Sequence, residues 1–355
     1  MLLYALFFIS LISKISGEGN CPMGQIESAC VNDCEENTRC VDLMALLVGG
    51  SNLAGWRNDA ELINDKNFTK KIADFPYTID APYGFWSGPT GGVVVCGGKN
   101  WDEDITETRC WRYLHCTDTW TQLYTDLPVP SSGGVGVPVQ YSSGEWGLWI
   151  LGGGNGVDAI DNVQILSTEG ENLVWSEGPR LLNSRYGHCA FLNPVTQQIH
   201  VFGGRDNQNI LKSMEILNIE AATSQVVEDW NFAENRWGAL CQTYQDSQGQ
   251  MKVGLMGGMD SFFIPHSSFY TMDIGIDGEV SLPVPGPTLP WSSAGSIGVA
   301  FQGKPTLVGG FSLAGYKHGI TNLEKDSWFT WSSDISSSRV SGLAVALPDD
   351  IFMYC

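Results

Sequence analysis

The sequence predicts an all-β protein built from a repeat of about 50 residues. A Gly-Gly pair ends a short apolar run six times, at successive spacings of 48, 55, 51, 54 and 52 residues. The runs are rich in Val, Leu and Ile and bounded by glycine, which is typical of buried strands. No amphipathic helical pattern of useful length appears. The pairs are Gly49-Gly50, Gly97-Gly98, Gly152-Gly153, Gly203-Gly204, Gly257-Gly258 and Gly309-Gly310.

Each repeat is predicted to contain four antiparallel strands. A further strand precedes the Gly pair, as in residues 187–192 and 238–244, and a polar stretch ending in Trp follows it. The length of one repeat suits a four-stranded propeller blade, with the Trp on its outer part between neighbouring sheets. These tryptophans are Trp120, Trp175, Trp230 and Trp331.

An apolar strand ending in Gly-Gly and a Trp about 23 residues later resemble the kelch motif. One repeat also has Arg185-Tyr186-Gly187-His188 at the start of a strand, which is kelch-like. The resemblance covers roughly residues 44–355 and implies a six-bladed kelch-type β-propeller. The first and fifth repeats depart from the motif, with Ile72 and Val280 at the expected Trp offset.

The two ends of the propeller sequence are expected to complete one blade together. Only one strand precedes the first Gly pair, and residues 339–347 form an apolar segment with the pattern of an innermost strand. Such pairing hides the sheet edges and locks the ring. Residues 351–355 are apolar and have no predicted place, and a seven-bladed ring is the alternative.

The N-terminal residues predict a secreted, extracellular protein. Residues 2–13 form an apolar run too short for a membrane span, and Ser16 and Gly17 follow it. We therefore expect a signal peptide at residues 1–17, with a signal anchor as the alternative. Asn67 begins the only N-x-S/T sequon and is a predicted glycosylation site.

Ten cysteines in a secreted chain predict disulfides. Residues 18–43 form a short cysteine-rich segment that we expect disulfides to staple, because it is too small for a core. The segment faintly resembles half of a whey-acidic-protein domain, without that domain's later cysteines. Zinc is the other chemical interpretation, but the segment has no His. Its cysteines are Cys21, Cys30, Cys34 and Cys40.

The other six cysteines lie in the predicted propeller, residues 44–355. Cys96 and Cys110 are expected on adjacent antiparallel strands, close enough for a disulfide. Cys189 and Cys241 are one repeat apart, so they occupy matching places on neighbouring blades. Cys116 and Cys355 remain as a pair or as two free thiols.

The composition excludes several classes of function. A net charge of −20 excludes tracking along nucleic acid and disfavours anionic membranes. No nucleophile elbow, zinc-protease helix or phosphate loop is present. Some kelch propellers are enzymes, such as the copper enzyme galactose oxidase, but the five His here have no compact ligand spacing. We expect no metal, cofactor or catalytic residue, and enzymatic activity stays open. The acidic run 102–104 is a weak Ca²⁺ candidate that solvation also explains.

The sequence favours a binding protein whose propeller loops dock an extracellular protein or matrix partner. Arg185, Tyr186 and His188 are the candidate ligand contacts at the channel mouth, and the alternative is that they only open a blade strand. A second hypothesis is a carbohydrate-binding or sugar-modifying propeller, similar to galactose oxidase or a sugar isomerase. In that case exposed aromatic residues would stack on sugar faces, the candidates being Trp56, Phe85, Trp86 and Trp101.

Overall fold

The structure is a computed structural model that describes residues 44–347 except 65–68, 89–90, 142–145, 170–171, 228–235, 302 and 333. The chain divides into two units, Met1–Val41 and Asp42–Cys355, and the described residues belong to the second. The predicted signal peptide, the N-terminal cysteines, Asn67, Trp230, residues 351–354 and Cys355 lie outside them. Over the described ranges the secondary structure is all β, and no helix there is long and apolar enough to cross a membrane.

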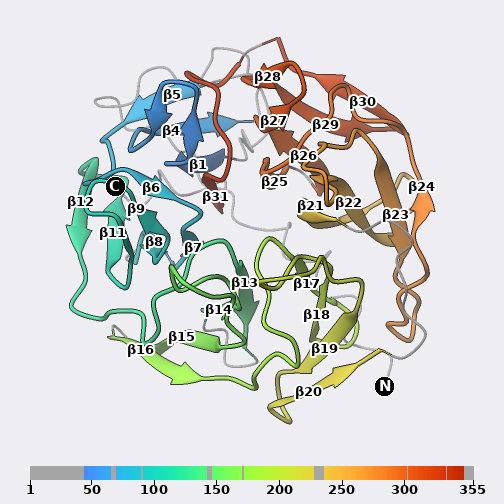
Figure 1. Cartoon of the computed structure of the whole chain (residues 1–355), viewed down its shortest axis with the longest axis horizontal. Coiled ribbons are helices and arrows are strands. Elements are labelled where there is room, and N and C mark those ends of the chain that lie inside the picture. Colours follow the sequence, from blue (N-terminus) through green and yellow to red (C-terminus); the bar gives the residue numbers. More distant parts are fainter. Residues whose placement is uncertain are drawn as a thin grey trace, which may run out of the picture. The chain divides into compact units, whose positions relative to one another are not determined.

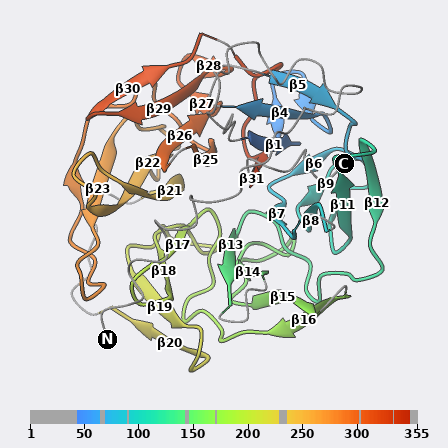
Figure 2. The same cartoon turned by 180° about the vertical axis from the view of Figure 1, so that it is seen from behind.

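The described strands form six four-stranded antiparallel sheets, an arrangement consistent with a β-propeller (Figures 1 and 2). Sheet 1 has the order β31-β1-β4-β5, with β1 (Met44–Val48), β4 (Ala60–Asn64), β5 (Thr69–Ile72) and β31 (Leu343–Leu347). Sheet 2 comprises β7 (Tyr83–Trp86), β8 (Val93–Cys96), β11 (Cys110–Leu114) and β12 (Thr119–Gln122). Sheet 3 comprises β13 (Val135–Gln140), β14 (Trp146–Leu151), β15 (Val163–Glu169) and β16 (Asn172–Glu177).

The other three sheets repeat this pattern. Sheet 4 comprises β17 (Cys189–Leu192), β18 (Gln198–Phe202), β19 (Met214–Asn218) and β20 (Thr223–Val226). Sheet 5 comprises β21 (Trp237–Gln245), β22 (Met251–Met259), β23 (Phe269–Asp273) and β24 (Val284–Pro285). Sheet 6 comprises β25 (Ile297–Phe301), β26 (Lys304–Val308), β29 (Ile320–Glu324) and β30 (Ser327–Thr330).

Short strands extend the loops that follow three of the Gly pairs. They are β2 (Ser51–Asn52) with β3 (Gly55–Trp56), β6 (Ile79–Asp80) with β9 (Lys99–Asn100) and β10 (Ile105–Thr106), and β27 (Phe311–Ser312) with β28 (Gly315–Tyr316). After these three Gly pairs the chain thus forms a small hairpin, β2–β3, β9–β10 or β27–β28.

The buried strands explain why the sequence runs are apolar without alternation. In β1, Met44, Leu46 and Val48 pack in a cluster between sheets 1 and 2, whereas Ala45 and Leu47 pack between sheets 6 and 1. Each sheet is thus covered on both faces by its neighbours, so both sets of alternate side chains must be apolar. Six such clusters separate successive sheets in a closed cycle.

The innermost strands also follow one another in a closed cycle around the middle of the unit (Figure 1). Contacts link β7 to β13, β13 to β17, β17 to β21, β21 to β25, β25 to β31 and β31 back to β7. The C-terminal strand β31 pairs antiparallel with β1, with Leu46 opposite Val345. Sheet 1 therefore contains strands from both ends of the described chain, which closes the cycle.

The Gly pairs connect each sheet to the next. All twelve glycines have positive φ, as the sequence pattern predicts. A Cβ on Gly49 would lie 2.4 Å from the Ile79 carbonyl oxygen, so only glycine fits this approach. The second glycine of each pair donates its N–H to a carbonyl of the strand that enters the following sheet; Gly153, for example, donates to Arg185 at 2.8 Å. Gly310 likewise donates to Arg339, across the junction between sheets 6 and 1.

A closed circle of six backbone hydrogen bonds lies where the innermost strands begin. Each member donates its N–H to the carbonyl oxygen of the member before it, at 2.6–3.2 Å, and the first donates to the last. All six have φ between +50° and +69°, a conformation that residues with a Cβ rarely adopt. We call them the ring residues; they are Ala81, Gly133, Gly187, Gly238, Gly295 and Ser341.

The three described tryptophans of the predicted pattern, Trp120, Trp175 and Trp331, pack between neighbouring sheets. Trp120 on β12 faces Tyr113, and Trp175 on β16 faces Leu166 at the corresponding place. In sheet 6 this place belongs to Trp328, opposite Leu323, whereas Trp331 lies just past β30. Trp331 is nevertheless buried in the cluster between sheets 6 and 1, as predicted. Trp230 lies outside the described residues, so its place stays a prediction.

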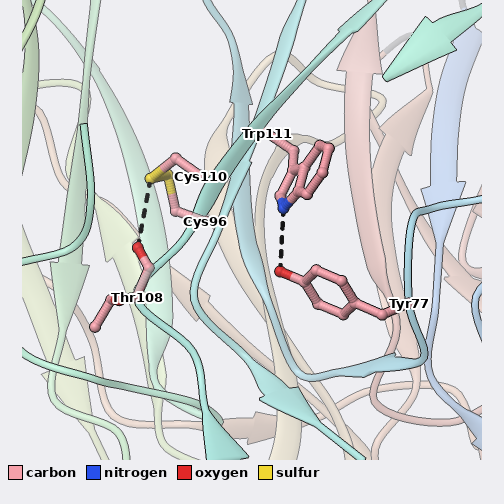
Figure 3. The surroundings of a disulfide bond; sticks show 5 residues. All are labelled: Tyr77, Cys96, Thr108, Cys110 and Trp111. Carbon is pink, nitrogen blue, oxygen red and sulfur yellow. Dashed lines mark hydrogen bonds between the residues drawn. A yellow bond between two sulfur atoms is a disulfide. The ribbon is translucent and has the colours of Figure 1, made fainter. Parts of the chain in front are cut away.

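Two of the expected disulfides are present. Cys96 and Cys110 lie directly opposite each other on β8 and β11, with a Cα–Cα distance of 4.1 Å. Figure 3 shows Cys110 and the next residue, Trp111, pointing to opposite sides of β11, where the Trp111 Nε1–H donates to the Tyr77 hydroxyl at 3.2 Å. The second disulfide joins Cys189 on β17 to Cys241 on β21 and so cross-links two innermost strands. Cys116 is also disulfide-bonded.

Candidate binding face

One face of the six sheets carries all six Gly pairs, and we call it the Gly-pair face. Second strands end there and third strands begin there, because the strands are antiparallel and the pairs follow the second strands. The innermost strands also begin on this face, at the ring residues. Loops of different sequence are therefore brought together around the ring, an arrangement typical of a binding surface on a rigid scaffold.

The structure places Arg185 in the interior, below this face. Its side chain is fully buried and forms an ion pair with Glu215 of β19, which is also fully buried. The guanidinium further donates to the carbonyl oxygens of Gly203 (2.9 Å) and Ser213 (3.3 Å). Glu215 in turn accepts the Leu182 N–H at 2.6 Å. Arg185 thus connects the segment that enters sheet 4 to the Gly pair and the third strand of the same sheet. Its side chain has no exposed surface for a ligand to contact.

His188 is buried as well, and both its ring nitrogens lack a hydrogen-bond partner among the described residues. Burial lowers the pKa of His188 to about 3, so the ring is neutral at physiological pH. His200 on β18 behaves similarly, because burial lowers its pKa to about 4. Of the three predicted ligand contacts, only Tyr186 is partly exposed on the Gly-pair face.

Tyr186 belongs to a cluster of aromatic rings around one arginine. Arg205, the residue after Gly204, exchanges two backbone hydrogen bonds with Tyr186 at 2.9 and 3.0 Å. Its guanidinium carbon lies 5.7 Å from the Tyr186 ring centroid and 5.3 Å from that of Trp237. Phe263 contacts Trp237 edge to face, with centroids 5.7 Å apart. We call Tyr186, Arg205, Trp237 and Phe263 the mouth patch, because Tyr186 and Trp237 each precede a ring residue.

Sequence reasoning missed three of these four residues, although the repeats contain a signal for them. Arg185-Tyr186-Gly187 and Arg236-Trp237-Gly238 occupy the same place in successive repeats, so Trp237 corresponds to Tyr186. Arg205 stands directly after a Gly pair. Aligning the repeats on both features would have placed Arg205 next to the two rings. Phe263 carries no such signal, because its position depends on the shape of its loop.

The loop that contains Phe263 holds its apolar side chains toward solvent. Asp260 Oδ1 accepts the N–H groups of Phe262 (2.8 Å) and Ile264 (3.0 Å), which fixes a tight turn. Within this turn Phe263 has a φ of +59°, an uncommon conformation for a bulky residue. Phe262 is nevertheless 80% exposed and Phe263 59% exposed. The turn therefore keeps a strained backbone conformation although its aromatic rings remain exposed.

Exposed apolar tips also mark three other loops of the Gly-pair face. Leu53, Val157 and Leu313 are 86%, 87% and 76% exposed. Leu53 and Leu313 stand at the same place in two similar hairpins of adjacent sheets, 51–56 (SNLAGW) and 311–316 (FSLAGY). Apolar side chains at these loop tips contribute nothing to the core, and their presence on several loops of one face makes them candidate contacts for a partner.

A stacked pair of indoles lies elsewhere on the same face. The Trp56 and Trp101 rings are parallel, with centroids 3.9 Å apart, and Lys99 Nζ lies 5.0 Å from the Trp101 centroid. Trp56 remains partly exposed. Of the other aromatics proposed for sugar stacking, Phe85 is buried and Trp86 packs against the core between sheets 1 and 2. The expectation that Phe85 is exposed is therefore wrong, whereas Trp86 is partly buried by its packing.

The acidic run after the second Gly pair is engaged in local contacts. Asp102 accepts the Thr78 N–H and hydroxyl, both at 2.9 Å, and Glu103 and Asp104 pair with Arg109 and Lys99. Across the described ranges, no group of three or more His, Cys, Asp or Glu side chains is placed to hold a metal ion. The carboxylates of this run organise their own loop.

Comparison with known proteins gives one partial similarity. A stretch of 110 residues is 32% identical to Kelch-like protein 23 of Mus musculus, and it covers 28% of this chain. The match spans only 17% of that relative's length. No family model matches the chain. Together with the all-β fold of four-stranded sheets, this similarity supports kelch repeats arranged as a β-propeller.

Proposed function

We propose that this chain is a secreted, six-bladed kelch-type β-propeller that binds an extracellular protein or matrix partner through its Gly-pair face. The observation that carries the proposal is the set of exposed apolar tips in four of the six loops of that face, with the mouth patch between two of them. The similarity to a kelch-like protein supports a protein partner. The cysteines support secretion, because disulfides persist in oxidising compartments.

The rigidity of the scaffold supports a docking role. Six interlocked sheets, the circle of ring residues and the Cys189–Cys241 disulfide fix the positions of the loops. Binding on preorganised loops loses little conformational entropy, so even a modest apolar contact area contributes to affinity.

The experiment is affinity capture from extracellular fluid with matched variants of the purified chain. One variant carries Phe262→Ser and Leu313→Ser on the Gly-pair face. The control carries Ile276→Ser and Leu282→Ser in the loop between β23 and β24, on the opposite face, where both side chains are exposed. We expect wild type and control to capture a stoichiometric protein that the first variant does not capture. Equal capture by all three would refute the assignment of this face.

Carbohydrate binding is a second candidate, favoured by the partly exposed Trp56 stacked on Trp101. An exposed indole face is a suitable platform for a sugar ring. The same capture is therefore repeated after enzymatic removal of glycans from the fluid, with Trp56→Ser as a further variant. Capture that disappears with the glycans and with Trp56→Ser would assign a carbohydrate ligand in place of a protein surface.

A further inference from the structure

The six loops that follow the Gly pairs share one turn. The third residue after the first glycine of each pair has a short polar side chain, whose oxygen accepts the backbone N–H two residues further on. Such a side chain closes the turn as a backbone carbonyl would. The six residues are Asn52, Asn100, Asn155, Asp206, Asp260 and Ser312.

Asn155 differs from the other two asparagines of this set in the residue that follows it. A leucine follows Asn52 and a tryptophan follows Asn100, whereas Gly156 follows Asn155. A glycine has no Cβ to shield its backbone nitrogen or to restrict its torsions, so its nitrogen can approach the side-chain amide before it. Asn155-Gly156 is the only Asn-Gly pair in the sequence.

The turn places the side-chain amide of Asn155 in a reactive arrangement. Its Oδ1 accepts the N–H groups of Val157 and Asp158, both at 2.9 Å. Two backbone donors on one oxygen polarise the amide, and they stabilise the negative charge that attack at Cγ places on that oxygen. The N–H of Gly156 has no acceptor among the described residues, so no hydrogen bond holds the attacking nitrogen elsewhere.

The side-chain nitrogen of Asn155 is free to leave into solvent. Residues 155–158 are exposed, and no described residue forms a hydrogen bond with Asn155 Nδ2. Asn100 differs in this respect, because its side chain is fully buried and its Nδ2 donates to Glu107 at 2.8 Å. Of the three asparagines, Asn155 alone combines an adjacent glycine with an exposed amide that two N–H groups polarise.

We propose that Asn155 is a site of spontaneous deamidation through a cyclic imide formed with Gly156. The backbone nitrogen of Gly156 loses its proton and bonds to Asn155 Cγ, and the side-chain nitrogen leaves as ammonia. Water then opens the imide at either of its two carbonyl carbons, which leaves an aspartate or an isoaspartate at position 155. Overall, water is consumed and ammonia is released. The proposal concerns the chemistry of this loop and does not depend on what the Gly-pair face binds.

The turn accommodates the aspartate product. Asp206 and Asp260 occupy the same place in the next two repeats, and their carboxylates accept N–H groups in the same way. These bonds lower the pKa of both carboxyl groups, so we expect the new carboxylate to be ionised at neutral pH.

The isoaspartate product changes the turn. It adds a carbon atom to the main chain between the Asn155 N–H and the Asp158 carbonyl, which form a hydrogen bond at 3.0 Å. The exposed Val157 lies between these two residues. Deamidation therefore adds a negative charge to this loop, and its isoaspartate branch also displaces the apolar tip.

The test incubates the purified full chain at neutral and at mildly alkaline pH and follows its peptides by mass spectrometry. Asparagine and aspartate peptides differ in mass, and chromatography separates isoaspartate peptides from aspartate peptides. Asn52 and Asn100 are the internal controls, because they stand in the same turn without a following glycine. The variant is Gly156→Val, and its folding is checked by urea denaturation.

We expect Asn155 to be converted roughly tenfold or more faster than Asn52 and Asn100, because only its neighbour lacks a Cβ. The rate should rise with pH, since the attacking nitrogen must lose its proton, and isoaspartate should be among the products. Gly156→Val should slow the conversion of Asn155 to the rate seen at Asn52.

Conversion of Asn155 no faster than that of the two controls would overturn the proposal. Conversion without isoaspartate, or at a rate that falls as the pH rises, would also overturn it, because direct hydrolysis would then be the route. An unchanged rate in a folded Gly156→Val protein would exclude Gly156 as the nucleophile. If that variant does not fold, the comparison with Asn52 and Asn100 in the wild type decides. The capture experiment above tests the proposed function independently.

Discussion

Arg185→Met is the substitution that most directly separates a structural role from a ligand-binding role. The buried guanidinium forms an ion pair with Glu215 and donates hydrogen bonds to Ser213 and Gly203. Methionine fills similar space but leaves the Glu215 charge buried with only neutral donors, such as the Leu182 N–H. Removing one partner of a buried ion pair costs about 3–5 kcal/mol, and we expect a loss of that size in the free energy of unfolding.

The assay is equilibrium urea denaturation followed by Trp fluorescence. Glu215→Gln and the double variant complete a double-mutant cycle, in which we expect the double variant to lose less than the sum of the two single losses. Arg205→Met serves as the control, because Arg205 is half-buried and forms no ion pair among the described residues; its expected loss is below about 1 kcal/mol. An Arg185→Met protein as stable as wild type that no longer binds the captured partner would refute the reasoning and restore Arg185 as a ligand contact.

Three other predictions concern stability. Gly133→Ala should destabilise by about 1 kcal/mol, because the new Cβ enters open space but the residue must keep a φ of +69°; an unchanged thermal midpoint would contradict this. Below its ordinary pKa of 6.5, His188 takes up a proton in the unfolded chain but not in the folded one, where burial lowers its pKa to about 3. The free energy of unfolding of the wild type therefore falls as the pH is lowered. In urea titrations, the difference in this free energy between wild type and His188→Asn should narrow by about 2 kcal/mol from pH 7 to pH 5. Replacing Cys189 and Cys241 together with Ala should cost up to about 4 kcal/mol, and an unchanged urea midpoint would show that the 52-residue loop is constrained by other means.

Several features of the fold were predictable because their causes are local. The Gly pairs end apolar strands where the backbone needs positive φ, and all twelve glycines adopt it. The apolar runs without alternation become strands covered on both faces. Cys96 and Cys110 were correctly paired because a short hairpin places them on adjacent strands.

Features that depend on loop length were harder to predict. The fixed spacing correctly predicted that Trp331 packs between sheets. It did not show that Trp328 is the residue opposite the third strand of sheet 6, because the connection between the third and fourth strands differs in length among the sheets. Exposure was also misjudged for Phe85, which packs between sheets 2 and 3. Which side of a strand faces a neighbouring sheet depends on the register of that strand, and a run of aromatic residues does not reveal it.

The sequence by itself determined the repeat, the four strands in each unit and the positions where only glycine fits, because these follow from local backbone sterics and strand periodicity. The tertiary structure alone decided what the polar residues at the ring do. Arg185 and Tyr186 are adjacent in the chain, yet Arg185 turns inward to Glu215 while Tyr186 lies beside Arg205 at the surface. Successive side chains of an extended strand point to opposite sides, and their surroundings come from residues far away in the sequence. The two rings beside Arg205 come from successive repeats, Tyr186 from sheet 4 and Trp237 from sheet 5, so only the packing of neighbouring sheets brings them together.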